Sequence, residues 1–219
     1  MRGLKDCRLY GIVDLAYVGA EDVSRVTEEL IKGGIDILQL RGKQQTVEEL
    51  TQLASEMHAI TSPNGVPLVV NDHAVIAMRV RVEGVHVGQD DEQVATVRER
   101  VGRPILVGKS THSLAQATAA MQEKPDYIGF GPLFATATKP DYRPIGLNDI
   151  GEAHRRLTIP IFCIGGIKLE NVEQVVAAGA RRVVIVSGLL QAKNIVEYAR
   201  SVRRFLDEAT ESKIKNRKS

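Results

Sequence analysis

Short runs of apolar, mostly β-branched residues alternate along the chain with longer segments whose apolar residues recur at helical spacing. The runs are typical of buried strands, and the longer segments are typical of amphipathic helices. Eight strands are predicted, over Leu9–Val13, Ile35–Leu40, Val66–Val70, Gly84–Val87, Ile105–Val107, Tyr127–Phe130, Ile159–Ile164 and Arg182–Val186. A helix is predicted after each strand, beginning near Val23, Thr46, Ala74, Val94, Leu114, Asp149, Glu170 and Asn194.

Local signals mark some helix boundaries. Thr46 and Glu49 have the spacing of a capping box, so a helix is expected to begin directly after Thr46. Gly33 and Gly34 follow an apolar helical stripe and predict its end. The last helix is predicted to end near Leu206, where the sequence becomes polar and basic.

Unbroken alternation of strands and helices predicts parallel strands joined by helical crossovers. Eight right-handed crossovers in succession close naturally into a barrel, whereas an open doubly wound sheet, the alternative, usually has fewer units. The expected fold is therefore a single-domain (β/α)8 TIM barrel over residues 1–208. Residues 209–219 are expected to form a flexible, polar and basic C-terminal tail.

The composition narrows the classes of partner. Of the 219 residues, 43% are hydrophobic and 26% are charged, as in an ordinary globular protein. The formal net charge of +2 and the 4% of aromatic residues argue against nucleic acid and anionic membranes as partners. Cys7 and Cys163 lie in apolar runs and are expected to be buried thiols in a reducing compartment. With no signal peptide or transmembrane stretch, a cytoplasmic location is expected.

In such a barrel the active site lies at the carboxyl ends of the strands, so chemistry is expected just after each strand. After the second strand, alternation places Gln39, Arg41 and Lys43 on one side. Two cations and an amide directed at one spot suit a polyphosphate. Taken alone, the segment is better explained as a solvated loop.

Carboxylates follow the next two strands. Asn71 and Asp72 end the third, and Asp90 and Asp91 follow the fourth. Neighbouring strand ends can share Mg²⁺, which prefers oxygen ligands and keeps waters and substrate phosphates in its shell. Capping of the next helix is the alternative, and it is preferred for Asp90. For Asp72 and Asp91 the two roles are evenly balanced.

Hydroxyl groups follow the fifth and sixth strands. Ser110 would either bind an anion or cap the next helix, and His112 would be either an acid or base or a structural residue. The loop 131–146 is long for a compact barrel, which makes it a candidate lid. It offers an anion clamp made of Thr136, Thr138 and Lys139.

Glycines end the last two strands. Gly165 and Gly166 follow the seventh, and Ser187 follows Val186 at the end of the eighth. Barrels frequently bind a phosphate between these two loops, and glycine lets backbone N–H groups approach it closely. Together the strand ends predict two anion sites and one Mg²⁺ site, as for a diphosphate beside a monophosphate.

The order and spacing of these motifs resemble those of the thiamine phosphate synthase family along nearly the whole chain. The matching segments are GIDILQLRGK (34–43), VVND (69–72), GVHVGQDD (84–91), YIGFGPLFATATK (127–139), IGGI (164–167) and VS (186–187). As an ordered set they are highly specific. Gly42 departs from the Glu that is usual in the family, and Lys109 departs from a small or apolar residue.

The resemblance implies a role for each predicted site residue. Hydroxymethylpyrimidine diphosphate would bind Gln39, Arg41, Lys43, Asn71, Ser110 and Lys139. The thiazole phosphate would bind Thr136, Thr138, Gly166, Val186 and Ser187. Asp72 and Asp91 would bind the Mg²⁺ cofactor. Catalysis is assigned to Arg41, Lys43, Ser110 and Lys139.

The implied reaction is a dissociative substitution by a transferase. The C–O bond to diphosphate breaks, and the thiazole nitrogen attacks the resulting pyrimidine-methyl cation, giving thiamine phosphate and diphosphate. A carboxylated thiazole would also lose CO2. The protein would position the substrates and neutralise the leaving group, with Mg²⁺ as Lewis acid. The two substrates are the expected partners, with no nucleic acid or membrane, and a homo-oligomer is left open.

Two other functions compete with this one. A thiazole tautomerase of the same superfamily would use His112 as acid or base, but tautomerisation needs no diphosphate site. A non-catalytic barrel that only binds a phosphorylated metabolite would show binding without turnover. The complete set of diphosphate and metal residues favours the synthase.

Overall fold

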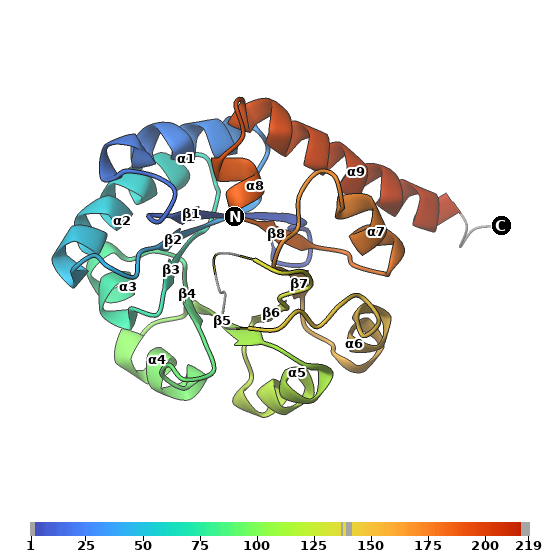
Figure 1. The fold of residues 1–219 in the computed structure, drawn as a ribbon. Coiled ribbons are helices and arrows are strands. Elements are labelled where there is room, and N and C mark those ends of the chain that lie inside the picture. The colour runs from blue at the N-terminus through green and yellow to red at the C-terminus, as the bar shows by residue number, and fades with distance from the viewer. Residues whose placement is uncertain (1–2, 137, 139–141, 216–219) are drawn as a thin grey trace.

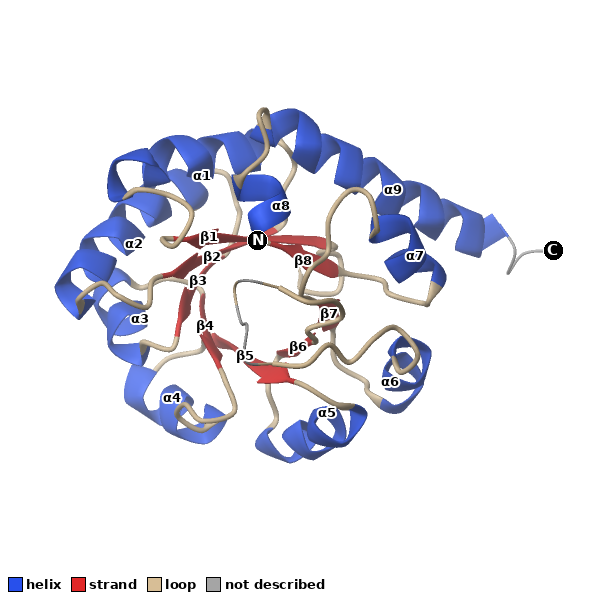
Figure 2. Cartoon of the chain, in the orientation of Figure 1, coloured by secondary structure: helices blue, strands red, loops and turns tan. Residues whose placement is uncertain are grey.

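The structure is a computed structural model that describes residues 3–136, 138 and 142–215. Eight parallel strands pair in chain order, and β8 pairs with β1 to close a barrel (Figures 1 and 2). The strands are β1 (Leu9–Asp14), β2 (Ile37–Arg41), β3 (Leu68–Asn71), β4 (Gly84–Val87), β5 (Leu106–Thr111), β6 (Tyr127–Phe130), β7 (Ile161–Cys163) and β8 (Val183–Ile185). The predicted TIM barrel is confirmed, and the open sheet is excluded.

Helices surround the ring of strands (Figure 2). They are α1 (Val23–Lys32), α2 (Val47–Thr61), α3 (Ala74–Val80), α4 (Val94–Val101), α5 (Leu114–Ala120), α6 (Ile150–Arg156), α7 (Val172–Ala177), α8 (Ser187–Leu190) and α9 (Ile195–Lys215). Two 3₁₀ turns, η1 (Ala20–Asp22) and η2 (Met121–Glu123), adjoin α1 and α5. The short helix α8 and both 3₁₀ turns have no counterpart among the predicted elements.

The predicted start of the helix after Thr46 and the predicted end of the helix before Gly33 are confirmed. Thr46 and Glu49 form both bonds of a capping box at the start of α2, and α1 ends at Lys32, directly before Gly33. The helix α9 continues past Leu206 to Lys215, so the expected C-terminal tail begins as helix. The flexibility of that tail stays a prediction.

Two hydrophobic cores lie on either side of the sheet. Outward-facing strand residues pack against the helices, and inward-facing ones fill the barrel. In the interior, Tyr10, Tyr127 and Phe162 pack edge to face with ring centroids 5.4–5.9 Å apart. Such contacts fill a barrel with side chains, so its interior is a packed core rather than a pore.

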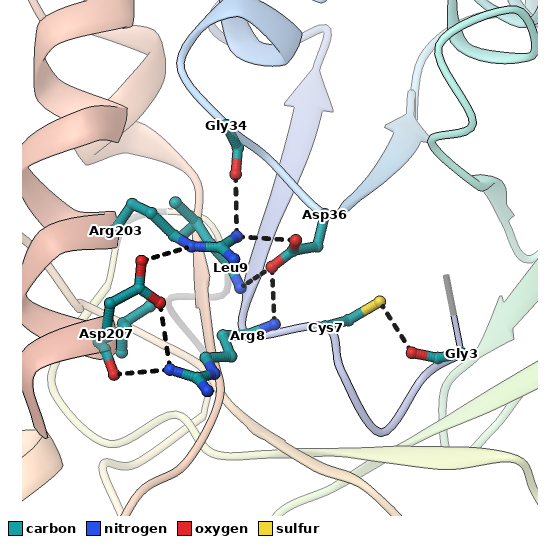
Figure 3. Close-up of polar contacts among 9 residues, drawn as sticks. Gly3, Cys7, Arg8, Leu9, Gly34, Asp36, Arg203 and Asp207 are labelled. Atoms are coloured by element: carbon teal, nitrogen blue, oxygen red, sulfur yellow. Dashed lines mark hydrogen bonds and ion pairs between the residues drawn. The ribbon is translucent and has the colours of Figure 1, made fainter. Parts of the chain in front are cut away.

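A polar network closes the amino end of the barrel (Figure 3). The fully buried Asp36 carboxylate accepts hydrogen bonds from the backbone N–H groups of Arg8 and Leu9 at 2.7 and 3.0 Å. It also pairs with Arg203 of α9 at 2.7 Å, and Arg203 and Arg8 both contact Asp207. Burial alone would raise the pKa of Asp36, but Arg203 and the two N–H groups hold it below its ordinary value.

Both cysteines are buried, as predicted. Burial raises the pKa of the Cys163 thiol to about 12, which keeps it protonated and unreactive at neutral pH. In the part of the chain that the structure describes, no helix combines the length and the apolar character needed to cross a membrane.

Candidate active site

A cavity opens at the carboxyl ends of the strands, and every strand contributes a side chain to its lining. The predicted site residues that line it are Gln39, Arg41, Asn71, Ser110, Thr136, Thr138, Gly166, Val186 and Ser187. The remaining predicted residues Lys43, Asp72 and Asp91 lie outside the lining itself. Asp72 contacts Asn71, and Lys43 and Asp91 both contact Asp72. Lys139 lies outside the described residues. The described residues of the predicted set therefore converge on one end of the barrel.

A buried carboxylate fixes Arg41. Asp14, at the end of β1, is 1% exposed and pairs with the Arg41 guanidinium at 2.5 Å. Its other oxygen accepts a hydrogen bond from the backbone N–H of Ala16. Parallel pairing of β1 with β2 sets Asp14 beside Arg41 in register, which explains why the two side chains meet. Sequence reasoning missed Asp14, although a carboxylate ending an apolar strand was a usable signal.

Polar groups from neighbouring strands gather around Asp72. Its carboxylate accepts hydrogen bonds from Lys43 at 2.5 Å and from the Asn71 amide at 2.6 Å. Burial raises the pKa of Asp72, Lys43 opposes that rise, and the adjacent Asp91 carboxylate adds to it. Asp91 accepts a hydrogen bond from the backbone N–H of Gly88 at 2.6 Å. Two carboxylates are thus held close together beside one lysine.

This donor set fits a hard divalent cation. Asp72 and Asp91 offer oxygen ligands from adjacent strand ends. Burial raises the pKa of Asp72 most, and a cation between the two carboxylates would relieve the repulsion that adds to this rise. Among the described residues, no cluster of three or more His, Cys, Asp or Glu side chains forms a complete metal cage. A cation held here would take its other ligands from water and from phosphate oxygens, as Mg²⁺ commonly does.

Inside the cavity, Gln39 and Ser110 are both hydrogen-bonded to other side chains. The Gln39 amide bonds the Tyr10 hydroxyl at 2.8 Å, and Ser110 bonds His86 at 2.9 Å. Burial raises the pKa values of Tyr10 and Tyr127 above the ordinary phenol value, so both stay protonated. Sequence reasoning missed both tyrosines, because a tyrosine inside an apolar strand is usually packing material.

The loops after β7 and β8 meet on the opposite side of the cavity. Gly166 adopts φ +65°, and a Cβ atom there would lie 2.7 Å from Phe134 Cβ and 2.8 Å from the Ala135 carbonyl oxygen. Only glycine suits this close, left-handed turn. Val186 and Ser187 line the same part of the cavity. Glycine at this position also lets the backbone come close to a ligand in the cavity.

Thr136 and Thr138, from the long loop after β6, border the cavity. Thr138 Oγ1 is 3.2 Å from the Tyr17 hydroxyl, and the Thr136 hydroxyl accepts a hydrogen bond from the backbone N–H of Thr138 at 3.3 Å. Both threonines line the cavity. A bond to the first βα loop therefore anchors this part of the long loop.

His112 lies at the cavity, whereas Lys109 points away from it. His112 lines the cavity, with Nδ1 2.6 Å from the Gly131 carbonyl oxygen and its ring 4.1 Å from that of Tyr142. Lys109 is 4% exposed and points away from the cavity to pair with Glu123 at 3.2 Å. Strand β5 extends to Thr111, so alternation turns Ser110 inward and Lys109 outward. The unusual lysine therefore lies outside the candidate site.

Gly42 is buried beside the candidate site. A Cβ atom there would lie 2.8 Å from Leu50 Cδ2 and 2.9 Å from Leu15 Cδ1. These leucines leave no room for a larger residue without a shift. Glycine at position 42 therefore fits the space that the surrounding side chains leave in this chain.

Comparisons with known proteins agree with this geometry. The sequence model of the family described as thiamine monophosphate synthase matches residues 9–189. A thiamine-phosphate synthase of Shouchella clausii is 36% identical over 209 residues, which are 95% of this chain and 100% of that protein. One from Chloroflexus aurantiacus is 39% identical over 199 residues, which are 90% and 92%.

A solved structure gives the same result. The thiamine phosphate pyrophosphorylase of Pyrococcus furiosus superposes with a TM-score of 0.84 and 26% identity, covering 94% of this chain and 98% of that one. Sequence and structure comparisons therefore point to one family over the whole barrel. The chain belongs to the thiamine monophosphate synthase family, and its function is that of a thiamine-phosphate synthase, a transferase enzyme.

Proposed function

We propose that the chain joins hydroxymethylpyrimidine diphosphate to a thiazole phosphate in this cavity, with Mg²⁺ bound by Asp72 and Asp91. One observation carries the proposal. Two cations, Arg41 and Lys43, lie at the end of β2 beside the carboxylates that end β3 and follow β4. Cations next to a pair of close carboxylates suit a metal-bound diphosphate.

The diphosphate would bind at the β2–β4 side of the cavity. Arg41, oriented by Asp14, would bind phosphate oxygens in a fixed geometry, because a guanidinium donates in a rigid planar fork. Lys43 is 54% exposed in its pair with Asp72, so it can turn from the carboxylate to a phosphate. Asn71 would donate to the same group, and Lys139 is proposed as a further cation.

The thiazole phosphate would bind at the β7–β8 side. Gly166 permits close approach of the backbone there, and Val186 and Ser187 border the same space. Thr136 and Thr138 would add hydroxyl donors from above. The two phosphate groups would then lie at opposite sides of one cavity, with the reacting rings between them.

The chemistry follows from these positions. When bound, Mg²⁺ supplies Lewis-acid neutralisation of the leaving diphosphate. Arg41 and Lys43 would stabilise the negative charge that develops as the C–O bond breaks. Ser110 and Gln39 would hold the pyrimidine ring so that its methylene carbon faces the thiazole nitrogen. No general base is required, because that nitrogen attacks with its own lone pair.

A direct assay tests the proposal. The purified protein is incubated with both substrates and Mg²⁺, and thiamine phosphate and diphosphate are quantified. We expect both products in equal amounts, and we expect chelation of the metal to abolish them. Tautomerisation of the thiazole phosphate in the absence of the pyrimidine would support the tautomerase instead. Binding without any product would support the non-catalytic barrel instead. A cytoplasmic location and the absence of nucleic acid and membrane partners stay predictions.

A further inference from the structure

Five polar side chains form one series of hydrogen bonds across the barrel, in the lining of the cavity. Gln39 Nε2 lies 2.8 Å from the Tyr10 hydroxyl, which lies 3.0 Å from the Tyr127 hydroxyl. Tyr127 continues to His86 Nδ1 at 3.2 Å, and His86 Nε2 reaches Ser110 Oγ at 2.9 Å. The series begins on β2, passes through β1, β6 and β4, and ends on β5.

The series has a direction. The Gln39 amide nitrogen can only donate, so the Tyr10 oxygen accepts from it and spends its single proton on Tyr127. Tyr127 in turn donates to His86 Nδ1, which places the proton of a neutral imidazole on Nε2. His86 then donates to Ser110 Oγ, so the Ser110 proton points to another acceptor.

The backbone leaves room for this arrangement. A Cβ atom at Gly108 of β5 would overlap the Tyr127 ring and lie 2.5 Å from His86 Nδ1. At Gly129 of β6 a Cβ atom would lie 3.5 Å from His86 Cε1. Gly108 therefore makes room for both rings, and Gly129 lies against the imidazole.

Polar groups at these positions are unusual. Interiors of such barrels are filled mainly by branched apolar residues, and a buried polar group is costly unless it is bonded. Gln39 is 2% exposed, and Tyr10 and Tyr127 are 1% exposed. Among the described residues, the polar partners of these three side chains are one another and His86. All five side chains of the series line the cavity, and Gln39 and Ser110 stand at its two ends.

We infer that Tyr10, Tyr127 and His86 are positioning residues that make the Ser110 hydroxyl a hydrogen-bond donor toward the pyrimidine ring and orient the Gln39 amide for the same ring. A ring nitrogen of an aminopyrimidine accepts hydrogen bonds, which matches a serine committed to donate. This inference rests on the proposed function, because that function assigns Gln39 and Ser110 to the pyrimidine diphosphate.

The decisive variant is Tyr127→Phe, which removes one oxygen from the middle of the series and leaves Gln39 and Ser110 in place. Loss of one hydrogen bond is worth about a kilocalorie per mole, so kcat/KM for the pyrimidine diphosphate is expected to fall roughly fivefold. The KM for the thiazole phosphate should change less than about twofold, because that ligand would lie on the other side. If Tyr127→Phe fails to fold, Tyr10→Phe takes its place. It breaks the preceding bond of the series and should lower kcat/KM for the pyrimidine diphosphate in the same way.

Thr27→Val is the matched control. It also deletes one buried hydroxyl, which donates to the Val23 carbonyl in α1, far from the cavity lining. It should leave both KM values and kcat unchanged. A double-mutant cycle adds the second readout: in a Ser110→Ala background, Tyr127→Phe should have less than about a twofold effect. Equal effects of Tyr127→Phe with and without Ser110, or no effect beyond that of the control, would overturn the inference.

A spectroscopic test needs no substrate. Ring ¹⁵N shifts in the ligand-free protein, with the His86 signals identified through their loss in His86→Gln, should show the Nε2–H tautomer. In Tyr127→Phe the tautomer ratio should shift toward Nδ1–H. An Nδ1–H tautomer in the unaltered protein would reverse the series and contradict the inference. Because this measurement is independent of turnover, it separates a failure of the inference from a failure of the proposed function.

Discussion

The two ends of the barrel use the same kinds of charged residue to opposite effect. At the amino end, Asp36 is fully buried and its partners all belong to the chain, as Figure 3 shows. At the carboxyl end, Lys43 is 54% and Asp72 is 16% exposed, and their neighbours line a cavity. A closed network contributes stability, whereas an open one keeps charge available for a ligand. This matches the division between stability and catalysis seen in such barrels.

Removing the carboxylates of the open end should cost the most. We expect Asp72→Ala and Asp91→Ala each to lower kcat by roughly 10³-fold, because the leaving diphosphate would lose its bound metal. Calorimetric titration should show the affinity for thiazole phosphate nearly unchanged, since the site proposed for that ligand lies across the cavity. The neighbouring exposed Asp90→Ala is the matched control and should keep full activity. Equal losses of turnover and of thiazole phosphate binding would contradict the metal assignment.

Breaking the closed end should reduce stability rather than activity. Asp36→Asn leaves buried donors and part of the Arg203 charge without their partner, and removing one member of a buried ion pair costs roughly 3 kcal/mol or more. Urea unfolding should show that loss, with kcat of the folded enzyme within about twofold. Asp22→Asn removes a partner of Arg25 in a mostly exposed pair and should leave the urea midpoint of unfolding nearly unchanged. Comparable losses in the two variants would mean that the closed network stabilises no more than a surface pair.

The same network predicts a pH dependence. The pKa of Asp36 is lower in the folded than in the unfolded protein, so its contribution is fully present above its ordinary value of 3.8. It is lost as the pH falls below that value toward the lowered folded pKa. Acid unfolding curves should therefore be less steep for Asp36→Asn than for the unaltered protein. If the acid unfolding curve is equally steep in Asp36→Asn and in the unaltered protein, other carboxylates cause that part of the pH dependence.

Asp14→Asn should give an intermediate effect at the open end. The amide keeps the shape, and its oxygen can still accept from Ala16, but it no longer fixes the Arg41 guanidinium by charge. We expect kcat/KM for the pyrimidine diphosphate to fall roughly 10- to 100-fold. Steady-state kinetics with the pyrimidine substrate varied would measure it. A loss of the same size in the thiazole phosphate KM would indicate general disruption of the cavity instead.

The smallest effect is expected at Lys109. Lys109→Met replaces a buried ammonium by an apolar chain, and Glu123, 33% exposed in the pair, can turn to water. Such replacements are often neutral or slightly stabilising, so the unfolding free energy should change by less than about 1 kcal/mol. Activity should stay within about twofold. A large loss of activity would place Lys109 in the catalytic machinery after all.

Much of the fold was predictable because its signals are local. The strands Gly84–Val87 and Tyr127–Phe130 coincide with their predicted bounds, and the helix Ala74–Val80 begins where it was predicted to begin. Strand β5 runs further than predicted, because Lys109, Ser110 and Thr111 are polar and resemble a loop. Their burial on both faces of the sheet depends on partners that adjacent sequence does not contain.

The candidate site was predictable only in part, for the same reason. Residues that follow a strand were identified by position, and the described ones do gather at one end of the barrel. The roles of Asp14, Tyr10 and Tyr127 depend on contacts between distant segments, and the two tyrosine hydroxyls that meet are 117 positions apart. A single sequence identifies which groups stand at strand ends, but not which neighbours orient them.

Pairing of β1 with β8 joins Leu9 to Val183, the first strand to the last. A nascent chain on the ribosome would therefore contain almost every cavity residue before any cavity exists. Closure must wait until β8 has emerged from the exit tunnel, and Arg203 of α9 ties the last helix to Asp36, beside the start of β1, only after that. Such long-range pairing is slow to form. Until β8 has been made, the unfinished sheet presents two open edges, at which another chain can pair.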